Sequence, residues 1–182
     1  MRKTGIILAG GKSSRMNEDK GLMILNGKPM IQYLIDVLRT VVAEIIIVSN
    51  NPAYEQFGCP VYSDLIKDKG PLAGIYTGLF YSQNETNIVL SCDVPYVTEE
   101  LIAFLIEQHQ YFQITIPLKS CRTHQLIGVF SKSCTANFKR SVEKEELKLI
   151  AAFKNLSLNV VDANHFDGDL FRNLNTPNDL DN

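Results

Sequence analysis

Residues 5–20 read GIILAGGKSSRMNEDK, and this stretch decides how the fold begins. Its first residues, 5–8, form a short apolar run, which is typical of a strand that is covered on both faces. Two adjacent glycines follow, and then a polar segment that carries Lys12, Arg15 and Lys20. Glycines allow backbone amides to approach a ligand closely, and three cations can surround a triphosphate. The stretch therefore predicts a strand followed either by an anion-binding loop or by an ordinary solvated loop with surface cations.

Two well-known phosphate-binding motifs do not fit this loop. A P-loop requires a glycine five positions before Gly11, and Ile6 occupies that position. The dinucleotide-binding fingerprint is G-x-G-x-x-G, whereas Gly10 and Gly11 are adjacent and no third glycine follows at the required spacing. The sequence therefore supports neither a Walker-type ATPase nor a nicotinamide-dependent enzyme.

Apolar runs of the same kind recur at residues 44–49 and 87–91. Helical patterns lie between and after them, beginning at Pro29, at Pro71 and at Thr98. Alternation of strands and helices at this spacing predicts parallel strands that are joined by right-handed crossovers. We therefore expect a three-layer α/β fold with a mostly parallel sheet, which binds its ligands beyond the carboxyl ends of the strands.

The rest of the chain is less regular. Residues 113–117, 126–130 and 158–162 are predicted strands, and residues 133–154 are predicted to be largely helical. With 182 residues, 45% of them hydrophobic, the chain can bury one continuous core. It contains no internal repeat and no composition shift typical of a linker, so we expect a single domain over residues 1–182.

The composition argues against several classes of function. Eighteen Lys and Arg residues against twenty Asp and Glu residues give a net charge of −2, so no global positive field favours a nucleic-acid partner. The apolar stretch near the start is too short for a signal peptide or a membrane span, so we expect a cytoplasmic protein without membrane association. The four cysteines are scattered, which predicts neither a zinc site nor a disulfide framework.

Asp93 follows the apolar run 87–91 directly, in the segment SCDVP. A carboxylate at the carboxyl end of a strand can hold Mg²⁺ while substrate phosphates and water supply the remaining oxygens. An aspartate at this point could equally make a turn or cap the following helix. The local sequence leaves both roles open.

The segment GPLAG at residues 70–74 begins a predicted helix, and Asp64 lies a few residues before it. The amides of a first helical turn favour an anion, and glycines permit the close approach of a ring or a ribose. Gly74 and Gly78 could instead form a smooth face against which another element packs. His124, in a polar stretch, is either a ligand contact or an ordinary solvated side chain.

Four motifs together resemble the molybdenum cofactor guanylyltransferases, in this order and over nearly the whole chain. They are LAGGKSSRM (8–16) with DK (19–20), GPLAG (70–74), CDVP (92–95) and NLNTPNDL (173–180). The resemblance implies a Rossmann-like nucleotidyltransferase fold, GTP as the donor, molybdopterin as the acceptor and Mg²⁺ as the metal. It also suggests molybdoenzymes or their chaperones as protein partners.

The resemblance further implies roles for individual residues. It assigns nucleotide binding to Leu8, Ala9, Gly10, Lys20, Asn50, Asp64 and Asp93. It assigns catalysis to Arg15, Lys20 and Asp93, with Asp93 as the metal ligand. It places His124 and Asn175 on the acceptor side.

The function predicted in this way is transfer of GMP from GTP to molybdopterin, with release of pyrophosphate. Two alternatives stay open: a related transferase for another base or acceptor, such as a cytidylyltransferase or a sugar-phosphate nucleotidyltransferase, and an inactive nucleotide-sensing domain. Gly10 argues against the cytidylyl type, which resembles LAAG at this point. Retention of Arg15, Lys20 and Asp93 argues against a sensor.

Overall fold

The computed structural model describes residues 2–10, 19–175 and 179. The described residues form one sheet of eight strands and one separate two-stranded hairpin. The strands of the large sheet are β1 (Lys3–Leu8), β4 (Glu44–Val48), β5 (Val61–Tyr62), β6 (Thr86–Ser91), β7 (Ile114–Lys119), β8 (Arg122–Thr123), β9 (Ile127–Ser131) and β10 (Leu158–Asp162); the hairpin is β2 (Ile24–Leu25) with β3 (Lys28–Pro29). The α-helices are α1 (Met30–Val41), α2 (Gly70–Tyr81), α3 (Glu99–His109), α4 (Thr135–Glu143) and α5 (Leu149–Ala152); the 3₁₀ helices are η1 (Lys20–Leu22), η2 (Pro52–Phe57), η3 (Lys132–Cys134) and η4 (Gly168–Phe171).

Strand β1 lies near the middle of the sheet, whose order is β10-β7-β9-β6-β1-β4-β5 with β8 paired to β7. It is parallel to β4 on one side and to β6 on the other. Strand β9 runs antiparallel to both β6 and β7. The chain moves outward from β1 in one direction and later returns to its other side, so the carboxyl edge at β1 and β6 is the topological switch point, where such sheets bind ligands.

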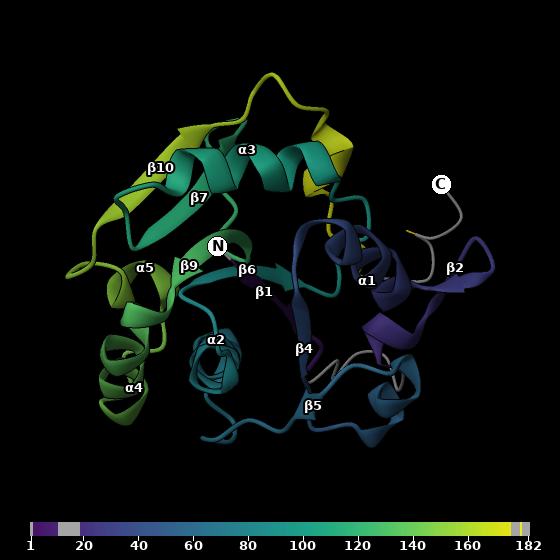
Figure 1. Cartoon of the computed structure of the whole chain (residues 1–182), viewed down its shortest axis with the longest axis horizontal. Coiled ribbons are helices and arrows are strands. Elements are labelled where there is room, and N and C mark those ends of the chain that lie inside the picture. Colours follow the sequence, from purple (N-terminus) through teal and green to yellow (C-terminus); the bar gives the residue numbers. More distant parts are fainter. Residues whose placement is uncertain (1, 11–18, 176–178, 180–182) are drawn as a thin grey trace.

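Helices cover both faces of the sheet (Figure 1), which confirms the predicted three-layer α/β arrangement. Helices α1 and α3 pack on the face that carries Ile7, Ile47 and Ile88, whereas α2, α4 and α5 pack on the face that carries Ile6 and Ile46. Because adjacent strand residues point to opposite faces, burial of both faces requires the continuous apolar runs seen in the sequence.

The predicted helix over residues 133–154 is interrupted. Helix α4 ends at Glu143, and α5 does not begin until Leu149. Glu145 has a φ of 61°, and the Glu146 amide donates a hydrogen bond to the Ser141 carbonyl at 2.9 Å. A left-handed residue followed by such a bond is a common way to end a helix, so the charged run forms a break and not a continuous helix.

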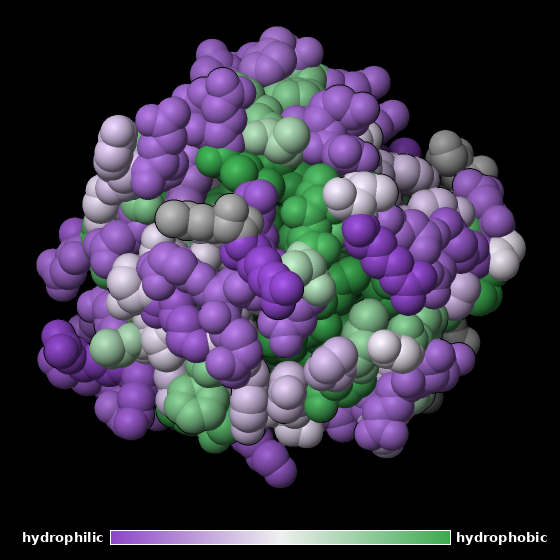
Figure 2. All heavy atoms as spheres, viewed as in Figure 1, coloured by the Kyte–Doolittle hydropathy of each residue, from purple (hydrophilic) through white to green (hydrophobic). Residues whose placement is uncertain are grey.

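Hydrophilic side chains cover most of the face seen in Figure 2, and hydrophobic ones gather near its centre. Within residues 2–10, 19–175 and 179, we find no helix with both the length and the apolar character that a membrane crossing requires.

The glycines of α2 let this helix pack closely on β1. A Cβ on Gly74 would lie 3.2 Å from Leu8 Cδ2, and one on Gly78 would overlap the buried side chain of Ile6. Of the two roles that the sequence left open for the glycines of this helix, the structure supports close packing for Gly78.

We expect Gly78→Ala to destabilise the fold. Overpacking costs about 1–3 kcal/mol, and the better helix propensity of alanine returns about 1 kcal/mol, so the net loss in the free energy of unfolding should be up to about 2 kcal/mol. Urea denaturation measures it. Gly168→Ala is the control, because among the described residues its Cβ would meet only Lys119 Cε, at 4.0 Å. Equal stability of the two variants would contradict the packing role.

Candidate active site

Three strands end at the same edge of the sheet and bring predicted site residues together there. Beyond β1, the Ala9 amide donates to the Val48 carbonyl at 2.9 Å, and the Cys92 amide donates to the Leu8 carbonyl at 3.0 Å. Ala9 is buried, whereas Gly10 is exposed. The chain therefore leaves the sheet at Gly10, and its backbone is accessible at the mouth of the switch point.

Asp93 lies just beyond β6 with its side chain 14% exposed. Its Oδ2 accepts a hydrogen bond from Asn173 Nδ2 at 3.3 Å and lies 4.0 Å from Lys20 Nζ. Its Oδ1 is buried without a hydrogen-bond partner among the described residues. A buried carboxylate oxygen without a partner is costly, and a bound cation would satisfy it.

The described part of the chain contains no group of three or more His, Cys, Asp and Glu side chains that could hold a metal ion. A cation at Asp93 would therefore take one protein carboxylate and complete its shell with phosphate oxygens and water. Mg²⁺ in nucleotide-binding sites is commonly held in this way. The donor set at Asp93 fits a metal that arrives with its nucleotide.

Lys20, the first residue of η1, extends towards Asp93 and the C-terminal segment. Its Nζ donates a hydrogen bond to Asn175 Oδ1 at 2.6 Å. The Leu174 amide donates to the Asp93 carbonyl at 2.9 Å, which fixes this segment against the end of β6. Arg15 lies outside the described residues.

Asn50 and Asp64 form a second pair at the same edge, beyond β4 and β5. Asn50 Nδ2 donates to Asp64 Oδ2 at 3.2 Å, and the Asp64 amide donates to Asn50 Oδ1 at 3.2 Å. Burial raises the pKa of Asp64 above its ordinary value. A Cβ on Gly74 would lie 3.8 Å from Asp64 Oδ1, so the Asn50–Asp64 pair lies beside Gly74 of α2.

A pocket of about 410 Å³ adjoins Asp93 on the side of β8 and β9. Arg122, His124 and Asn173 are among the residues that line it. The His124 ring packs on Phe171 with ring centroids 4.8 Å apart. Burial, and then the positive charge of Arg122, lower the pKa of His124, so its ring is neutral near pH 7 and can donate one hydrogen bond and accept another.

Known proteins resemble this chain in sequence and in structure. Residues 5–158 match the family model described as a MobA-like NTP transferase domain. The chain belongs to the family of MobA-like NTP transferases. Membership of this family makes the protein an enzyme, a nucleotidyltransferase.

Curated relatives cover nearly the whole chain of this MobA-like transferase. It is 36% identical to the "Probable molybdenum cofactor guanylyltransferase" of Flavobacterium johnsoniae, with 97% of this chain and 94% of the relative covered. It is also 36% identical to the molybdenum cofactor guanylyltransferase of Yersinia pestis, with 98% and 93% covered. The predicted family resemblance is therefore confirmed.

A solved structure supports the fold. The crystal structure of molybdopterin-guanine dinucleotide biosynthesis protein A from Archaeoglobus fulgidus superposes with a TM-score of 0.82. The alignment covers 98% of this MobA-like chain and 95% of the other, at 21% sequence identity. The Rossmann-like nucleotidyltransferase fold expected from the resemblance is confirmed.

The structure of this MobA-like domain also shows residues that sequence reasoning did not single out as site residues. Asn173 contacts the Asp93 carboxylate, and Arg122 lines the adjoining pocket. The carboxylate of Asp19, which precedes Lys20, accepts hydrogen bonds from Asn51 and Tyr54, which follow β4. Asp19 and Asn173 belong to the DK and NLNTPNDL motifs, which was the available signal, but their contacts are visible only in three dimensions.

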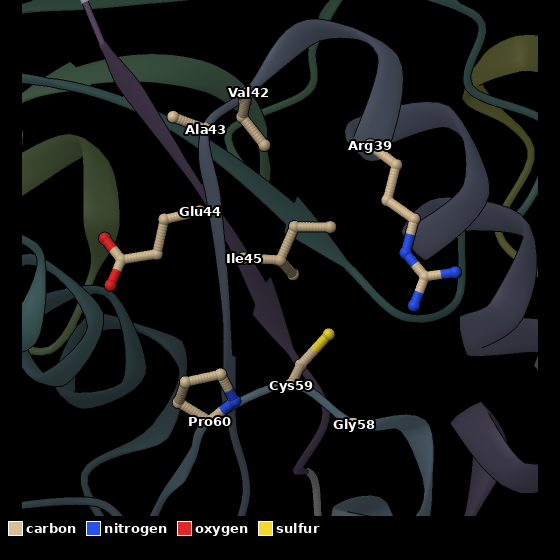
Figure 3. A pocket seen from close by; sticks show the side chains of 8 residues that line it. All are labelled: Arg39, Val42, Ala43, Glu44, Ile45, Gly58, Cys59 and Pro60. Carbon is tan, nitrogen blue, oxygen red and sulfur yellow. The ribbon is translucent and has the colours of Figure 1, made fainter.

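A second pocket in this MobA-like fold, of about 380 Å³, lies at the amino ends of β4 and β5, opposite the carboxyl ends that carry Asn50 and Asp64 (Figure 3). It is formed where α1 ends and β4 and β5 begin. The Arg39 and Cys59 side chains lie beside it, whereas the Glu44 carboxylate points away and accepts a hydrogen bond from Thr4 Oγ1 at 3.1 Å. This pocket is separated from Asp93 by the length of the strands.

Proposed function

We propose that the protein transfers GMP from GTP to molybdopterin, forming the guanine dinucleotide cofactor and pyrophosphate. Both curated relatives are named for this reaction. The observation that carries the proposal is the Asp93 carboxylate, with one oxygen near Lys20 and Asn173 and the other buried without a partner at the switch point. Such a carboxylate suits a metal-bound triphosphate, and the adjoining pocket supplies a place for an acceptor.

The donor nucleotide is proposed to bind across the carboxyl edge of β1. The backbone of Leu8, Ala9 and Gly10 contacts the guanine, and the Asn50–Asp64 pair lies on the same edge as a further nucleotide contact. Lys20 and Arg15 contact the triphosphate. Their positive charges reduce the repulsion between the donor and an anionic acceptor.

Asp93 is the residue proposed to hold Mg²⁺, and the ion supplies a positive charge that stabilises the departing pyrophosphate when it is bound. Asn173 holds Oδ2 of this carboxylate through its amide group, which orients the carboxylate. His124 and Asn175 are proposed to lie near the acceptor. The pocket that joins His124 to Asp93 supports this place for His124, and the contact of Asn175 with Lys20 lies close to the same carboxylate.

The reaction needs no covalent nucleophile on the protein. The terminal phosphate of molybdopterin is already an anion, so one of its oxygens attacks the α-phosphorus of GTP without strong help from a general base. A new phosphorus–oxygen bond forms, and the bond from the α-phosphorus to the pyrophosphate breaks. The protein contributes positioning and charge.

The remaining proposals concern the setting of the reaction. We propose that the enzyme acts in the cytoplasm and that molybdoenzymes or their chaperones receive its product. We also propose that residues 1–182 work as one domain, since the two largest of the three core clusters lie on opposite faces of the same central sheet.

One incubation tests the function against its alternatives. The protein is mixed with Mg²⁺, molybdopterin and GTP, CTP or ATP in separate reactions, and mass spectrometry identifies the dinucleotide formed. Guanine dinucleotide from GTP is the expected product. A cytosine dinucleotide would identify the cytidylyl type. No product with any nucleotide despite tight nucleotide binding would refute molybdopterin as the acceptor, and a repeat with sugar phosphates would then separate a sugar-phosphate nucleotidyltransferase from the sensing domain.

We expect Asp93→Asn to lower turnover by about 10²-fold or more, because it removes a full ligand charge while the side chain keeps its size. Turnover of GTP with molybdopterin measures the effect. Asp36→Asn is the control, since Asp36 pairs with Lys28 on the surface of α1. Near-normal turnover in a folded Asp93→Asn protein would refute the metal assignment.

We expect His124→Ala to raise the KM for molybdopterin while the KM for GTP stays unchanged, because His124 lines the proposed acceptor pocket. Steady-state kinetics with each substrate varied in turn measures both constants. His165→Ala is a matched control: this exposed histidine also packs on a phenylalanine, Phe104, at 5.2 Å. An equal rise in both KM values would place His124 outside the acceptor site.

We expect Gly10→Ala to shift the preference for GTP over CTP by roughly 10- to 200-fold at most, the scale of one methylene in a pocket. The structure supports this test, because Gly10 has no positive φ and, among the described residues, the atom nearest to its Cβ would be Ser49 Cα, at 3.8 Å. The added methyl group therefore fits against the described part of the chain and would crowd a purine. The measurement is kcat/KM for both nucleotides, and a parallel fall with an unchanged ratio would show that base choice lies elsewhere.

A further inference from the structure

Both carboxylate oxygens of Asp19 accept hydrogen bonds from residues other than the adjacent Lys20. The hydroxyl of Tyr54 donates a hydrogen bond to Oδ1, and Asn51 Nδ2 donates one to Oδ2 at 3.0 Å. An aspartate next to a lysine could simply neutralise it. Here the two side chains point to different partners, so the charge of Lys20 remains available to Asp93 and to a phosphate.

The two donors belong to a rigid part of the fold. Tyr54 is fully buried within η2, and burial raises the pKa of its hydroxyl above the ordinary value, so this group stays protonated and acts as a donor. The backbone amide of Asn51 donates a hydrogen bond to Ser49 Oγ at 3.1 Å, directly beyond β4. The side-chain oxygen Oδ1 of Asn51 accepts one from the backbone amide of Ala53 at 3.0 Å. Both donors are therefore tied to the end of a central strand.

The backbone that follows Asp19 carries this constraint to Lys20. The Leu22 amide donates to the Asp19 carbonyl at 3.0 Å, which closes the tight turn of η1 around Lys20. Gly21 is buried against the Tyr54 side chain so closely that a Cβ there would overlap the hydroxyl. Only the side chain of Lys20 remains free to extend, and it reaches Asn175 and the Asp93 carboxylate.

We propose that Asp19 is a positioning residue, and that Tyr54 and Asn51 act through it to hold Lys20 at the triphosphate site. The inference rests on the proposed function in one respect, namely that Lys20 contacts phosphate. Ordering the backbone of a residue costs conformational entropy, so fixing the backbone of Lys20 beforehand reduces the entropy that must be lost on binding. Asp19, Tyr54 and Asn51 themselves need not touch the nucleotide.

The test uses Tyr54→Phe, which removes the donated hydrogen bond and keeps the buried ring. Calorimetry measures the affinity of the full chain for magnesium tripolyphosphate, a probe that has neither a base nor an acceptor. We expect about a 10- to 100-fold loss of affinity, the range found when groups that orient a ligand-contacting residue are removed. Tyr33→Phe is the matched control, because it removes a hydroxyl that donates to the Leu25 carbonyl at 2.7 Å, and it should change the affinity less than about twofold.

A double variant separates positioning from general support of the fold. If Tyr54 acts through Lys20, then Tyr54→Phe should have no further effect in a Lys20→Ala protein, and the double variant should bind magnesium tripolyphosphate as Lys20→Ala does. Losses that multiply in the double variant would overturn the proposal. Asp19→Asn serves as a second variant if Tyr54→Phe does not fold, since it keeps the side-chain size and should give the same non-additive result.

Turnover of GTP with molybdopterin, measured on the same proteins, keeps the two proposals distinct. A wild-type protein that binds magnesium tripolyphosphate and shows the non-additive pattern, but makes no dinucleotide, would refute the proposed function and leave the positioning role intact. If the wild-type protein makes the dinucleotide but the Tyr54→Phe variant binds tripolyphosphate as tightly as the wild type does, the positioning role alone would be refuted. Absence of tripolyphosphate binding by the wild-type protein would also overturn it.

Discussion

The parallel pairing of β1 with β4 on one side and β6 on the other is the constraint on which the rest of the structure depends. It requires the three strands to end at one edge, and so brings Gly10, Asn50 and Asp93 to the same side of the sheet although they lie far apart in sequence. It also requires both faces of these strands to be buried, which explains their uninterrupted apolar sequences. A larger side chain at Gly78 would disturb β1, because Gly78 of α2 packs on Ile6 of this strand.

The main obstacle to the proposed reaction at this edge is the repulsion between negatively charged substrates. A chain with a net charge of −2 must bring two anions together, so the positive charges have to be local and correctly placed. We propose that Lys20 meets this need, because its neighbour Asp19 accepts hydrogen bonds from Tyr54 and Asn51. The unpartnered oxygen of Asp93 completes the arrangement, since a cation with its phosphates would satisfy it.

The sequence predicted the sheet and its main helices because apolar runs and helical stripes report burial directly. It also indicated Asp93, because parallel strands bind ligands at their carboxyl ends, whereas Asn50 and Asp64 were assigned to nucleotide binding by the family resemblance. It did not predict the β2–β3 hairpin, although Asn26-Gly27, both with positive φ, are the residues typical of such a turn. The partners of Asp19 and Asp93 could not be predicted, since Tyr54 and Asn173 reach them from 35 and 80 positions away and no local pattern encodes those contacts.

The long sequence separation of these contacts has a consequence for how the enzyme matures. Lys20 and Asn175 are 155 positions apart, and the Leu174 amide bonds to the Asp93 carbonyl. During translation, β1, β4 and β6 leave the ribosome well before residues 173–175 are made. The nascent chain therefore possesses β1, β4 and β6 for some time before it possesses the segment that contacts Asp93.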